Sequence, residues 1–292
     1  MSKVWLITGS SRGLGLDLAR AVLAAGDQLI ATARNPAQLA DLVAEYGDQV
    51  RAVALDVTDS GSARAAVAAA VTVFGRLDVV VNNAGYANVC SIEDVEEADF
   101  RAQVETNFFG VVNVTRAALP VLRGQGAGHI IQISSIGGRL GSAGLSAYQA
   151  SKWAVEGFSE VLAREVGPLG IRVTIVEPGG FRTDWAGSSM RVDPHNAAYD
   201  ATVGTVNAYR NKNDAAHGDP AKGAQAILKL AALEQPPLRL LLGSDAVFLA
   251  GMVATARAAE DEKWRALSLT TDFDGMPDFA QTPYAKMASK RS

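Results

Sequence analysis

The sequence predicts an α/β protein built on a doubly wound, seven-stranded parallel sheet with helices on both faces. Short β-branched segments alternate with longer Ala-rich segments of helical period, which is the pattern of βαβ units. The strand segments are almost entirely apolar, as expected when helices cover both faces of a sheet. Many of the 28 glycines lie at the ends of these apolar segments, where the chain must turn.

The elements follow one another in the order that this architecture requires. Each strand segment is a short apolar run bounded by turn residues, and each helix segment repeats its apolar positions every three to four residues. The strands are expected at Val4–Thr8, Gln28–Thr32, Val50–Leu55, Asp78–Asn82, His129–Ser134, Arg172–Glu177 and Leu238–Leu242. The helices are expected at about 14–25, 36–46, 60–74, 99–121, 147–167 and 220–233.

Composition and charge narrow the class of protein further. Of 292 residues, 48% are hydrophobic and 20% are charged, which excludes a disordered chain, a collagen and a disulfide scaffold. Cys90 is the single cysteine, so no internal disulfide can form and a reducing, cytoplasmic setting is expected. The net charge of −4 argues against a general nucleic-acid binder. No stretch is apolar enough to predict a membrane partner.

A glycine-rich turn follows the first predicted strand and opens the first predicted helix. Glycines let the chain turn tightly and let backbone N–H groups approach a pyrophosphate at the helix N-terminus. The spacing is G-x-x-x-G-x-G, so a turn without a ligand is the alternative. The residues expected to contact a dinucleotide here are Gly9, Ser11, Arg12, Gly13, Leu14 and Gly15.

Three motifs in this order resemble the classical short-chain dehydrogenase/reductase family. They are Thr8-Gly9-x-x-x-Gly13-x-Gly15, Asn82-Asn83-Ala84-Gly85 and Tyr148-x-x-x-Lys152. The resemblance covers residues 3 to 243 and implies a Rossmann-type sheet, an NAD(H) or NADP(H) cofactor and a tyrosine-based oxidoreductase site. It also predicts one domain, residues 1–243, with a substrate lid at about 185–219 and a helical extension of the same domain at 244–292.

The charges after the second strand favour NADP(H) over NAD(H). An NAD-selective fold places an acid there to bond the ribose 2′-OH. This chain has no acid at that point and continues with Arg34, while Arg12 lies in the glycine loop. A guanidinium suits the oxygens of a 2′-phosphate. The alternative is that Arg34 is an ordinary solvated arginine.

The resemblance extends the set of cofactor-binding residues beyond the first turn. Asp56 would face the adenine, although a helix cap is its alternative because capping residues follow it. Asn83 would lie near the adenosine ribose, with a structural role in the turn as its alternative. The segment from Pro178 would contact the nicotinamide carboxamide. The residues that this adds are Asp56, Val57, Asn83, Ala84, Gly85, Pro178, Gly179 and Thr183.

Tyr148 and Lys152 carry the predicted reaction centre and also belong to the cofactor site. Their i, i+4 spacing puts both side chains on one face of a helix. A free tyrosine has a pKa of about 10, and a neighbouring Lys⁺ favours the phenolate. Tyr148 is therefore the expected general acid for carbonyl reduction and the base for the reverse reaction.

Two further catalytic residues follow from the resemblance. Ser135, directly after the strand His129–Ser134, matches the serine that polarises the carbonyl oxygen, with its neighbour Ser134 as the alternative. Asn107, inside the helix expected at 99–121, matches the residue that holds a proton-relay water. Asparagine is unfavourable inside a helix, so a buried Asn at a helix kink is its alternative.

The substrate and partners are less sharply defined. The expected substrate is a small carbonyl compound or alcohol of apolar character, because Trp185, Met190, Tyr199 and Tyr209 lie in the lid region. These side chains could instead pack beneath the lid, and Arg182 or Arg191 could meet an anion. The three histidines lack ligand spacing, so no metal site is expected. The resemblance also implies a homodimer or homotetramer built through 99–121 and 147–167. A cofactor-binding regulatory protein without turnover is the alternative function.

Overall fold

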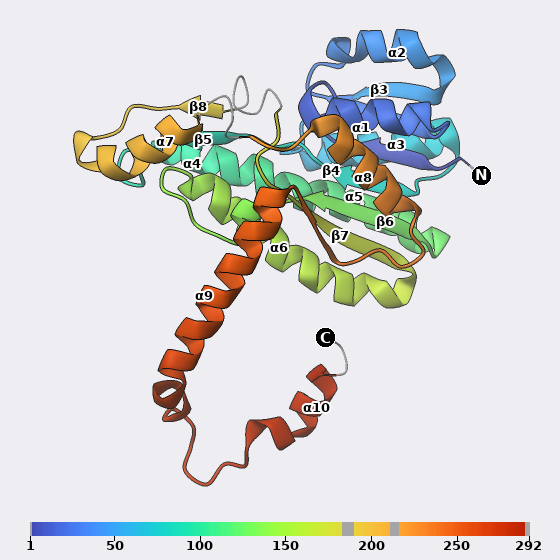
Figure 1. The fold of residues 1–292 in the computed structure, drawn as a ribbon. Helices are drawn as coiled ribbons and strands as arrows, with labels where there is room; N and C mark the ends of the chain where they lie inside the picture. Colours follow the sequence, from blue (N-terminus) through green and yellow to red (C-terminus); the bar gives the residue numbers. More distant parts are fainter. Residues whose placement is uncertain (1, 183–189, 211–215, 290–292) are drawn as a thin grey trace. The chain divides into compact units, whose positions relative to one another are not determined.

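The computed structural model describes residues 2–182, 190–210 and 216–289 (Figure 1). The chain consists of two compact units, Met1–Ala250 and Gly251–Ser292. The first unit contains every strand and every residue predicted for the site whose position is described. The site is therefore built within this unit alone.

A seven-stranded sheet, parallel throughout, forms the centre of the first unit. Its strand order is β3-β2-β1-β4-β6-β7-β9. This confirms the predicted α/β fold with a doubly wound, seven-stranded parallel sheet, and each strand lies within two residues of its expected bounds. The strands are β1 Val4–Ile7, β2 Gln28–Ala33, β3 Val50–Ala54, β4 Val79–Asn82, β6 Gly128–Ile133, β7 Ile171–Pro178 and β9 Arg239–Leu242.

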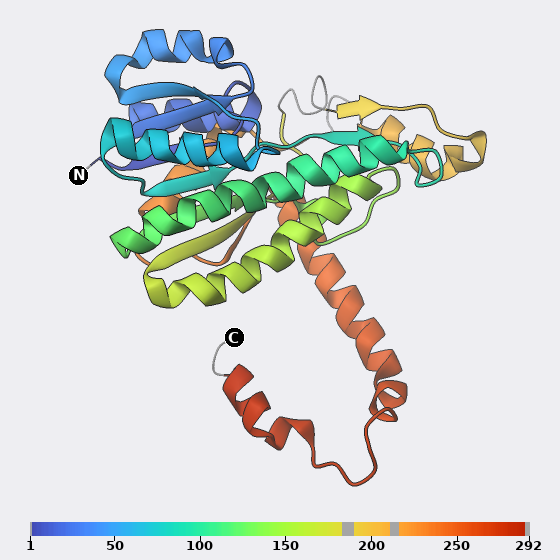
Figure 2. The ribbon, with the colours of Figure 1, turned by 180° about the vertical axis from the view of Figure 1, so that it is seen from behind.

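Helices cover both faces of this sheet (Figures 1 and 2). Successive residues of β1 point to opposite faces: Trp5 belongs to the core cluster beneath one helix layer and Leu6 to the cluster beneath the other. Both side chains are fully buried, which explains why the strand is apolar without alternation. One layer holds α1 Gly13–Ala24, α2 Ala40–Tyr46 and α8 Pro220–Ala232, and the other holds α3 Ser60–Phe74, α5 Gly110–Gln125 and α6 Ser146–Val166.

The strand order reverses direction beside β1, and this places the site. The chain moves outward from β1 through β2 to β3 and then returns to β4 on the other side of β1. In open α/β sheets, ligands bind at the carboxyl ends of the strands beside such a reversal. The turn after β1 and the turn after β4 meet there.

The long helix expected at 99–121 is interrupted in the structure. It consists of α4 Glu97–Val104, a π-helical turn Glu105–Phe109, and α5. The sequence pattern did not reveal the π turn because one additional residue in a turn hardly changes a helical period. Single π turns within helices are frequently found at functional sites, and Asn107 lies in this one.

A two-stranded sheet that the sequence did not predict lies outside the main sheet. β5 Ala87–Val89 pairs in parallel with β8 Met190–Val192. β8 belongs to the lid region, where strand signals were weak. The lid continues with a short 3-10 turn Ala197–Tyr199, a π turn Asp200–Gly204 and α7 Thr205–Arg210.

The helix α9 Ser244–Leu269 begins in the first unit, where it buries small side chains and exposes large apolar ones. Its first turns bury Ala246 and Ala250, whereas Phe248 is 70% exposed and Val247 is 58% exposed. A one-residue step along a helix rotates a side chain by about 100°, so the small residues and the large ones occupy different faces. The second unit continues with α10 Pro283–Ser289. No helix among the described residues is both long and apolar enough to cross a bilayer.

Candidate active site

The glycine loop after β1 is closed by backbone contacts that only glycine permits. Gly9 has a φ of +68° and Gly13 a φ of +54°, a region that side chains with a Cβ rarely adopt. A Cβ at Gly15 would lie 2.3 Å from the Gly9 carbonyl oxygen. The loop leads directly into the N-terminus of α1, as a pyrophosphate cradle requires. The residues present therefore fit a dinucleotide phosphate.

Thr8 and Asn83 tie the turn after β4 to this loop. The amide Nδ2 of Asn83 donates to the Thr8 and Gly9 carbonyl oxygens at 2.9 and 3.2 Å. The Thr8 hydroxyl accepts from the backbone N–H groups of Asn83 and Ala84, both at 2.9 Å. The Asn83 side chain thus holds the glycine loop in place, which is the structural role left open for it. Thr8 was part of the quoted motif but was not predicted as a site residue.

Asp56 and Val57 follow β3 at the same end of the sheet. The exposed carboxylate of Asp56 accepts from the N–H of Thr58 at 3.0 Å and from its hydroxyl at 2.8 Å. The cap of α3 is Asp59, which accepts from the Gly61 N–H at 2.7 Å. Asp56 is therefore not the helix cap, and its place at the sheet's carboxyl end is compatible with an adenine contact. Val57 is buried beside Gly110, and a Cβ at Gly110 would lie 2.6 Å from the Val57 side chain.

Arg12 and Arg34 lie on neighbouring turns at the carboxyl end of the sheet. Arg12 precedes α1 and Arg34 directly follows β2, the strand paired with β1. Both side chains are exposed. Burial and Asp99 raise the pKa of the Tyr86 phenol, and the positive charges of Arg191 and Arg34 oppose that rise. Arg34 therefore lies close enough to Tyr86 for its positive charge to act on the phenol.

Tyr148 and Lys152 are buried on one face of α6. The Lys152 Nζ lies 5.7 Å from the centre of the Tyr148 ring and donates to the Ile133 carbonyl oxygen at 2.7 Å. Burial lowers the pKa of Lys152 from 10.5 to about 8, although the nearby carboxylate of Glu156 opposes this effect. Near neutral pH the lysine therefore still carries a positive charge beside the phenol.

Ser135 lies at the end of β6, where the chain enters a 3-10 turn Ile136–Gly138 that packs against α6. The Ser135 hydroxyl accepts from the Gly137 N–H at 3.0 Å. The adjacent Ser134 points elsewhere, because its hydroxyl donates to the Glu156 carboxylate at 2.9 Å. The structure thus separates the two serines, and Ser134 is bound into a buried ionic cluster.

Asn107 is fully buried in the π turn and makes a reciprocal pair with Tyr86. Its Oδ1 accepts from the Tyr86 N–H at 3.0 Å, and its Nδ2 donates to the Tyr86 carbonyl oxygen at 2.8 Å. A Cβ at Gly85 would lie 2.9 Å from Asn107 Oδ1 and 3.8 Å from Lys152 Nζ. Asn107, Gly85 and Lys152 are therefore close neighbours.

The turn after β7 completes the predicted cofactor side of the site. Pro178 ends β7, and a Cβ at Gly179 would lie 2.2 Å from a carboxylate oxygen of Asp245. Asp245 is in the first turn of α9 and accepts from the Gly180 N–H at 2.7 Å. Asp245 could not be predicted as a site residue, since nothing in a helix start predicts a contact 65 residues away. Thr183 lies outside the described residues.

Tyr148 belongs to an apolar cluster that includes residues of the lid. A core cluster joins Tyr148 to Val89 of β5, Leu145 and Val203, with Met190 packed against it. Tyr199 also packs against this cluster, and its hydroxyl donates to Glu93 at 2.6 Å. The predicted lid residues Met190 and Tyr199 therefore pack against the cluster that contains Tyr148. Trp185 lies outside the described residues, and Tyr209 is exposed.

The charged side chains Arg191 and His195 of the lid are paired with carboxylates. Arg191 on β8 forms ion pairs with Asp99 and Asp193, and His195 lies 3.1 Å from Asp200. Arg191 is thus engaged by two carboxylates, which disfavours its alternative assignment as an anion-binding residue. Among the described residues, no three His, Cys, Asp or Glu side chains are grouped as a metal site would require.

The sheet, the glycine loop and the adjacent Tyr–Lys pair define a Rossmann-type α/β protein. The short chain dehydrogenase family model matches residues 3–193. The chain also shares 55% identity over 273 residues with "Oxidoreductase BOA17" of Botryotinia fuckeliana, covering 93% of this chain and all of that protein. The chain belongs to the short-chain dehydrogenase family of oxidoreductases.

Other relatives and solved structures agree with this assignment. A "3-ketodihydrosphingosine reductase" of Bacteroides thetaiotaomicron is 38% identical over 245 residues, which is 82% of this chain and 88% of that protein. A short-chain dehydrogenase structure from Streptomyces avermitilis has a TM-score of 0.87 and 44% identity, covering 94% of this chain and all of that one.

Several of the similar structures contain a nicotinamide dinucleotide, which is NADP or a derivative of it in four of them and NADH in another. A short-chain dehydrogenase from Burkholderia cenocepacia is in complex with NADP, with a TM-score of 0.71, 26% identity, and coverage of 90% of this chain and 97% of that one. A 3-ketoacyl-(acyl-carrier-protein) reductase from Brucella melitensis is complexed with NADH, with a TM-score of 0.70, 27% identity, and coverage of 82% and 96%.

Proposed function

We propose that this oxidoreductase interconverts a carbonyl group and a secondary or primary alcohol with NADP(H), using Tyr148 as the general acid or base. One observation carries the proposal. The buried Lys152 ammonium lies 5.7 Å from the Tyr148 ring on the same face of α6. A positive charge held beside a phenol in a site of low polarity favours the phenolate. It therefore assists proton transfer to and from the Tyr148 hydroxyl.

The other residues of the site have complementary roles in this proposal. The bound cofactor supplies hydride to a carbonyl carbon, or accepts it from an alcohol. Tyr148 donates the proton to the carbonyl oxygen during reduction, and the Ser135 hydroxyl donates a hydrogen bond to the same oxygen as negative charge develops. Asn107 holds the turn at Tyr86 close to Lys152, and the lysine keeps its positive charge beside the tyrosine.

The cofactor residues proposed are those predicted from the sequence, with NADP(H) preferred. Gly9, Ser11, Gly13, Leu14 and Gly15 form the loop and the start of α1 that would hold the pyrophosphate. Arg12 and Arg34 lie at the end of the sheet where a 2′-phosphate would be recognised, and β2 ends without an acid. Four of the similar structures contain NADP or a derivative of it and one contains NADH, so the proposed preference rests mainly on these two arginines.

The remaining cofactor assignments follow the family pattern. Asn83 acts here through the glycine loop, because its side-chain amide is bonded to that loop. Thr183 keeps the role that the resemblance implies. The other residues that we assign to the cofactor are Asp56, Val57, Ala84, Gly85, Pro178 and Gly179.

The substrate we propose is a predominantly apolar carbonyl compound or alcohol. Tyr148 belongs to an apolar cluster with Val89 and Val203, and Met190 packs against this cluster, so the surroundings of the reacting group are apolar. Arg191 follows Met190 on β8, and its charge is paired with Asp99 and Asp193. A desolvated apolar wall favours a substrate of matching character.

Turnover of NADPH tests the proposed function. Oxidation of NADPH is measured with aliphatic and aromatic ketones and aldehydes, in the purified wild type and in Tyr148→Phe. We expect turnover by the wild type and a loss of about 10²–10⁴-fold in the variant, because the transferable proton is removed while the glycine loop can still bind NADPH. Tight NADPH binding without turnover of any carbonyl compound would instead support a regulatory protein that does not catalyse hydride transfer.

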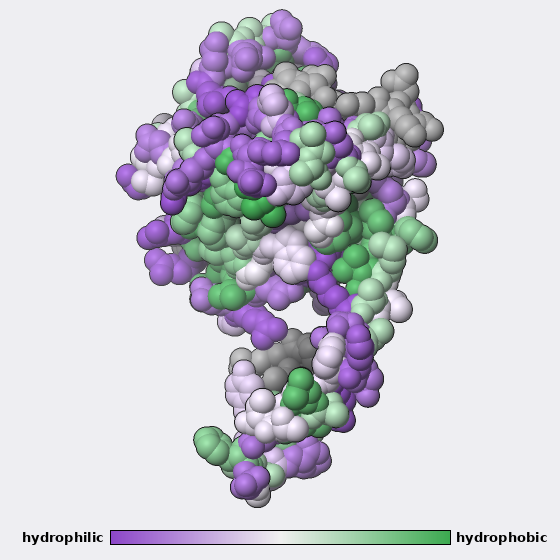
Figure 3. Space-filling model, turned by 90° about the vertical axis from the view of Figure 1, so that its left-hand side faces the viewer, coloured by the Kyte–Doolittle hydropathy of each residue, from purple (hydrophilic) through white to green (hydrophobic). Residues whose placement is uncertain are grey.

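We also propose that the chain forms a homodimer or homotetramer through α4–α5 and α6. Phe109, Trp153 and Val161 lie on these helices and are 44%, 44% and 56% exposed. A hollow of about 450 Å³ beside the π turn is lined by apolar side chains such as Ile92 and Phe100 and by the charged residues Glu97, Arg101 and Glu105. Figure 3, which views the side that carries α4 and α7, shows hydrophobic residues at the surface there. Light scattering that gives the mass of a monomer would reject this assembly.

A further inference from the structure

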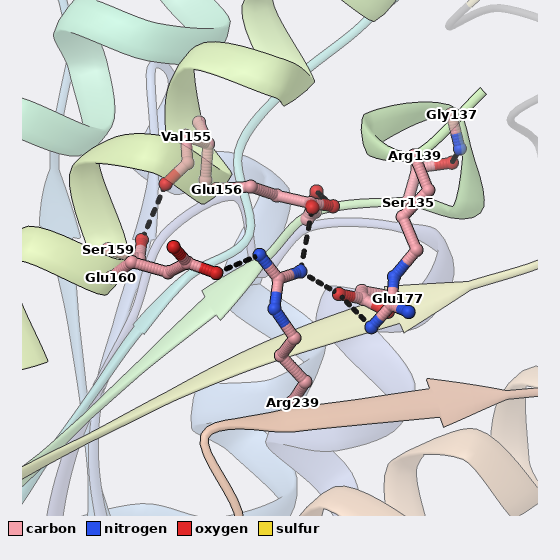
Figure 4. Close-up of polar contacts among 10 residues, drawn as sticks. Ser135, Gly137, Arg139, Val155, Glu156, Ser159, Glu160, Glu177 and Arg239 are labelled. Carbon is pink, nitrogen blue, oxygen red and sulfur yellow. Dashed lines mark hydrogen bonds and ion pairs between the residues drawn. The ribbon is translucent and has the colours of Figure 1, made fainter. Parts of the chain in front are cut away.

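Two buried glutamates share an arginine beneath the loop that carries Ser135. Glu156 on α6 is 5% exposed, and Glu177 near the end of β7 is fully buried. The Arg239 Nη1 from β9 lies 2.7 Å from Glu156 Oε2 and also donates to Glu177 Oε1. Its Nη2 reaches Glu160, one turn further along α6, at 2.7 Å. Figure 4 shows these side chains converging from three elements.

The two glutamates hold both ends of the loop Ser134–Arg139. At the start of the loop, the Ser134 hydroxyl donates to Glu156 Oε1 at 2.9 Å. At its end, the Arg139 Nη2 donates to Glu177 Oε1 at 3.0 Å. Ser135 lies between these two anchors. The loop can move only if one of these charged contacts breaks.

The loop also lies tightly against Glu156 at its centre. A Cβ at Gly138 would be 2.0 Å from Glu156 Oε1 and 2.8 Å from the Ser134 hydroxyl. Gly138 therefore leaves the space into which the carboxylate reaches. The contact between Gly138 and the Glu156 carboxylate therefore limits how closely the loop and α6 can pack.

Glu156 lies one helical turn beyond Lys152, so it is also linked to the reaction centre along α6. Lys152 donates to the Ile133 carbonyl oxygen, one residue before Ser134. The charge of Glu156 raises the pKa of Lys152 and so opposes the effect of burial. The helix face Tyr148–Lys152–Glu156 therefore contacts the strand end and its loop at successive positions.

We propose that Glu156 is a positioning residue, which orients the Ser135 loop through Ser134 and supports Lys152 on the same helix face. The inference rests on the proposed function, because it assigns Ser135 to the carbonyl oxygen. Stability alone does not account for the cluster, since buried ion pairs are often replaced by apolar residues without loss of stability. The described contacts link these charges to the loop, and the loop to the site.

A matched pair of variants tests this assignment. Glu156→Gln keeps the size of the side chain but removes the charge, which breaks the ion pair with Arg239 and weakens the charge-assisted hydrogen bond from Ser134. Glu160→Gln is the control, because Glu160 also pairs with Arg239 but is about half exposed and lies one turn further along α6 from the loop. We expect kcat to fall about tenfold or more in Glu156→Gln and less than twofold in Glu160→Gln, because small displacements of a reacting group strongly reduce rates. KM for NADPH should stay unchanged in both.

Ser134→Ala separates positioning from a general loss of packing. If Glu156 acts through Ser134, Ser134→Ala lowers kcat on its own, and the double variant with Glu156→Gln is little worse than Glu156→Gln alone. Losses in kcat that multiply in the double variant would overturn the link through Ser134. Equal effects of Glu156→Gln and Glu160→Gln would overturn the special role of Glu156.

Hydrogen exchange supplies a readout that does not require turnover. In the purified full-length variants, amides of residues 135–139 should exchange faster in Glu156→Gln than in the wild type, and at the wild-type rate in Glu160→Gln. Unchanged exchange in Glu156→Gln would overturn the inference. If the wild type reduces no carbonyl compound while exchange changes as expected, the proposed function fails and Glu156 still orders the loop.

Discussion

Asp245 Oδ2 accepts a hydrogen bond of 2.7 Å from the backbone N–H of Gly180, so the first turn of α9 holds the turn that follows β7. The carboxylate lies where side chains on Gly179 and Gly243 would otherwise be, because a Cβ at either position would approach it within 2.5 Å. The helix that continues into the second unit therefore begins by ordering the turn that we assign to the nicotinamide.

Asp245→Ala should weaken NADPH binding several-fold. The variant leaves the Gly180 N–H without its partner, and a buried unpaired N–H costs about 1–3 kcal/mol. Isothermal titration with NADPH measures the effect. Asp245→Asn keeps an acceptor oxygen and should stay within about twofold of the wild type. Equal affinity in Asp245→Ala and the wild type would show that this contact does not order the cofactor turn.

Arg34→Asp should reverse the preference between the two cofactors. The substitution replaces the proposed partner of a 2′-phosphate by an acid that can accept from a ribose 2′-OH. We expect kcat/KM for NADPH to fall about 10²-fold or more and kcat/KM for NADH to rise. Arg51→Asp is a control on the neighbouring strand β3, at an exposed position. Comparable efficiency with NADH and NADPH, unchanged by Arg34→Asp, would exclude the proposed preference.

The activity should decline above about pH 8. Burial lowers the pKa of Lys152 to about 8, so the lysine loses its positive charge above that pH and Tyr148 loses the stabilisation of its phenolate. The pH profile of kcat/KM measures this limb. Lys152→Arg keeps the charge at all these pH values, so its lower activity should show no decline near pH 8. An identical alkaline limb in both proteins would assign the limb to another group.

Lys152 should have the opposite effect on stability over the same range. The unfolded chain holds the lysine proton up to about pH 10.5, whereas the folded chain releases it near pH 8. The unfolded state therefore binds more protons between these values, and stability rises with pH there. The rise should be absent in Lys152→Met, as measured by urea unfolding at pH 8 and pH 10.

Acid should destabilise the protein through His129. Burial, with Arg172 and Lys3, lowers the pKa of this histidine from 6.5 to about 4. The unfolded chain takes up the proton as pH falls through 6.5 and the folded chain does not, so stability is lost between pH 6.5 and pH 4. The full loss is about 3 kcal/mol. Unfolding of His129→Gln should depend less on pH in this range, whereas the exposed control His217→Gln should behave as the wild type does.

Gly15→Ala should disrupt the cofactor loop. Its Cβ would lie 2.3 Å from the Gly9 carbonyl oxygen and 2.5 Å from Asn83 Nδ2, so the turn between β1 and α1 would have to open. We expect NADPH binding to be lost and the melting temperature to fall. Gly124→Ala, on an exposed part of α5 with no atom within 4 Å of the added Cβ, should be neutral or stabilising by about 0.5–1 kcal/mol. NADPH binding that survives Gly15→Ala would place the pyrophosphate elsewhere.

The parts of the fold and site that the sequence predicted depend on local pattern. Apolar β-branched runs and helical periods are properties of neighbouring residues, which is why all seven strands of the main sheet were predicted. Glycine spacing located the turn after β1, and the i, i+4 spacing of Tyr148 and Lys152 located the pair on one face of a helix. The π turn at Asn107 escaped prediction because it follows the same apolar pattern as an α-helix.

The tertiary structure decided the contacts between residues that are distant in the chain. β5 and β8 are separated by about 100 residues, and neither is recognisable alone because each has only three residues. The contact of Asp245 with Gly180 spans 65 residues, and that of Arg239 with Glu156 spans 83. The sequence pattern does not show which residues form such pairs. A buried charge needs a partner, and the chain offers many polar residues that could serve.

The sequence alone thus determined the fold class, the glycine loop and the Tyr–Lys pair, because each follows from the conformational preferences of adjacent residues. Only the tertiary structure decided that Asn83 holds the glycine loop, that Asp56 bonds Thr58 while Asp59 caps the helix, and that two buried glutamates lie beneath Ser135. These outcomes depend on which polar groups become buried together, and packing settles which hydrogen-bond partners remain.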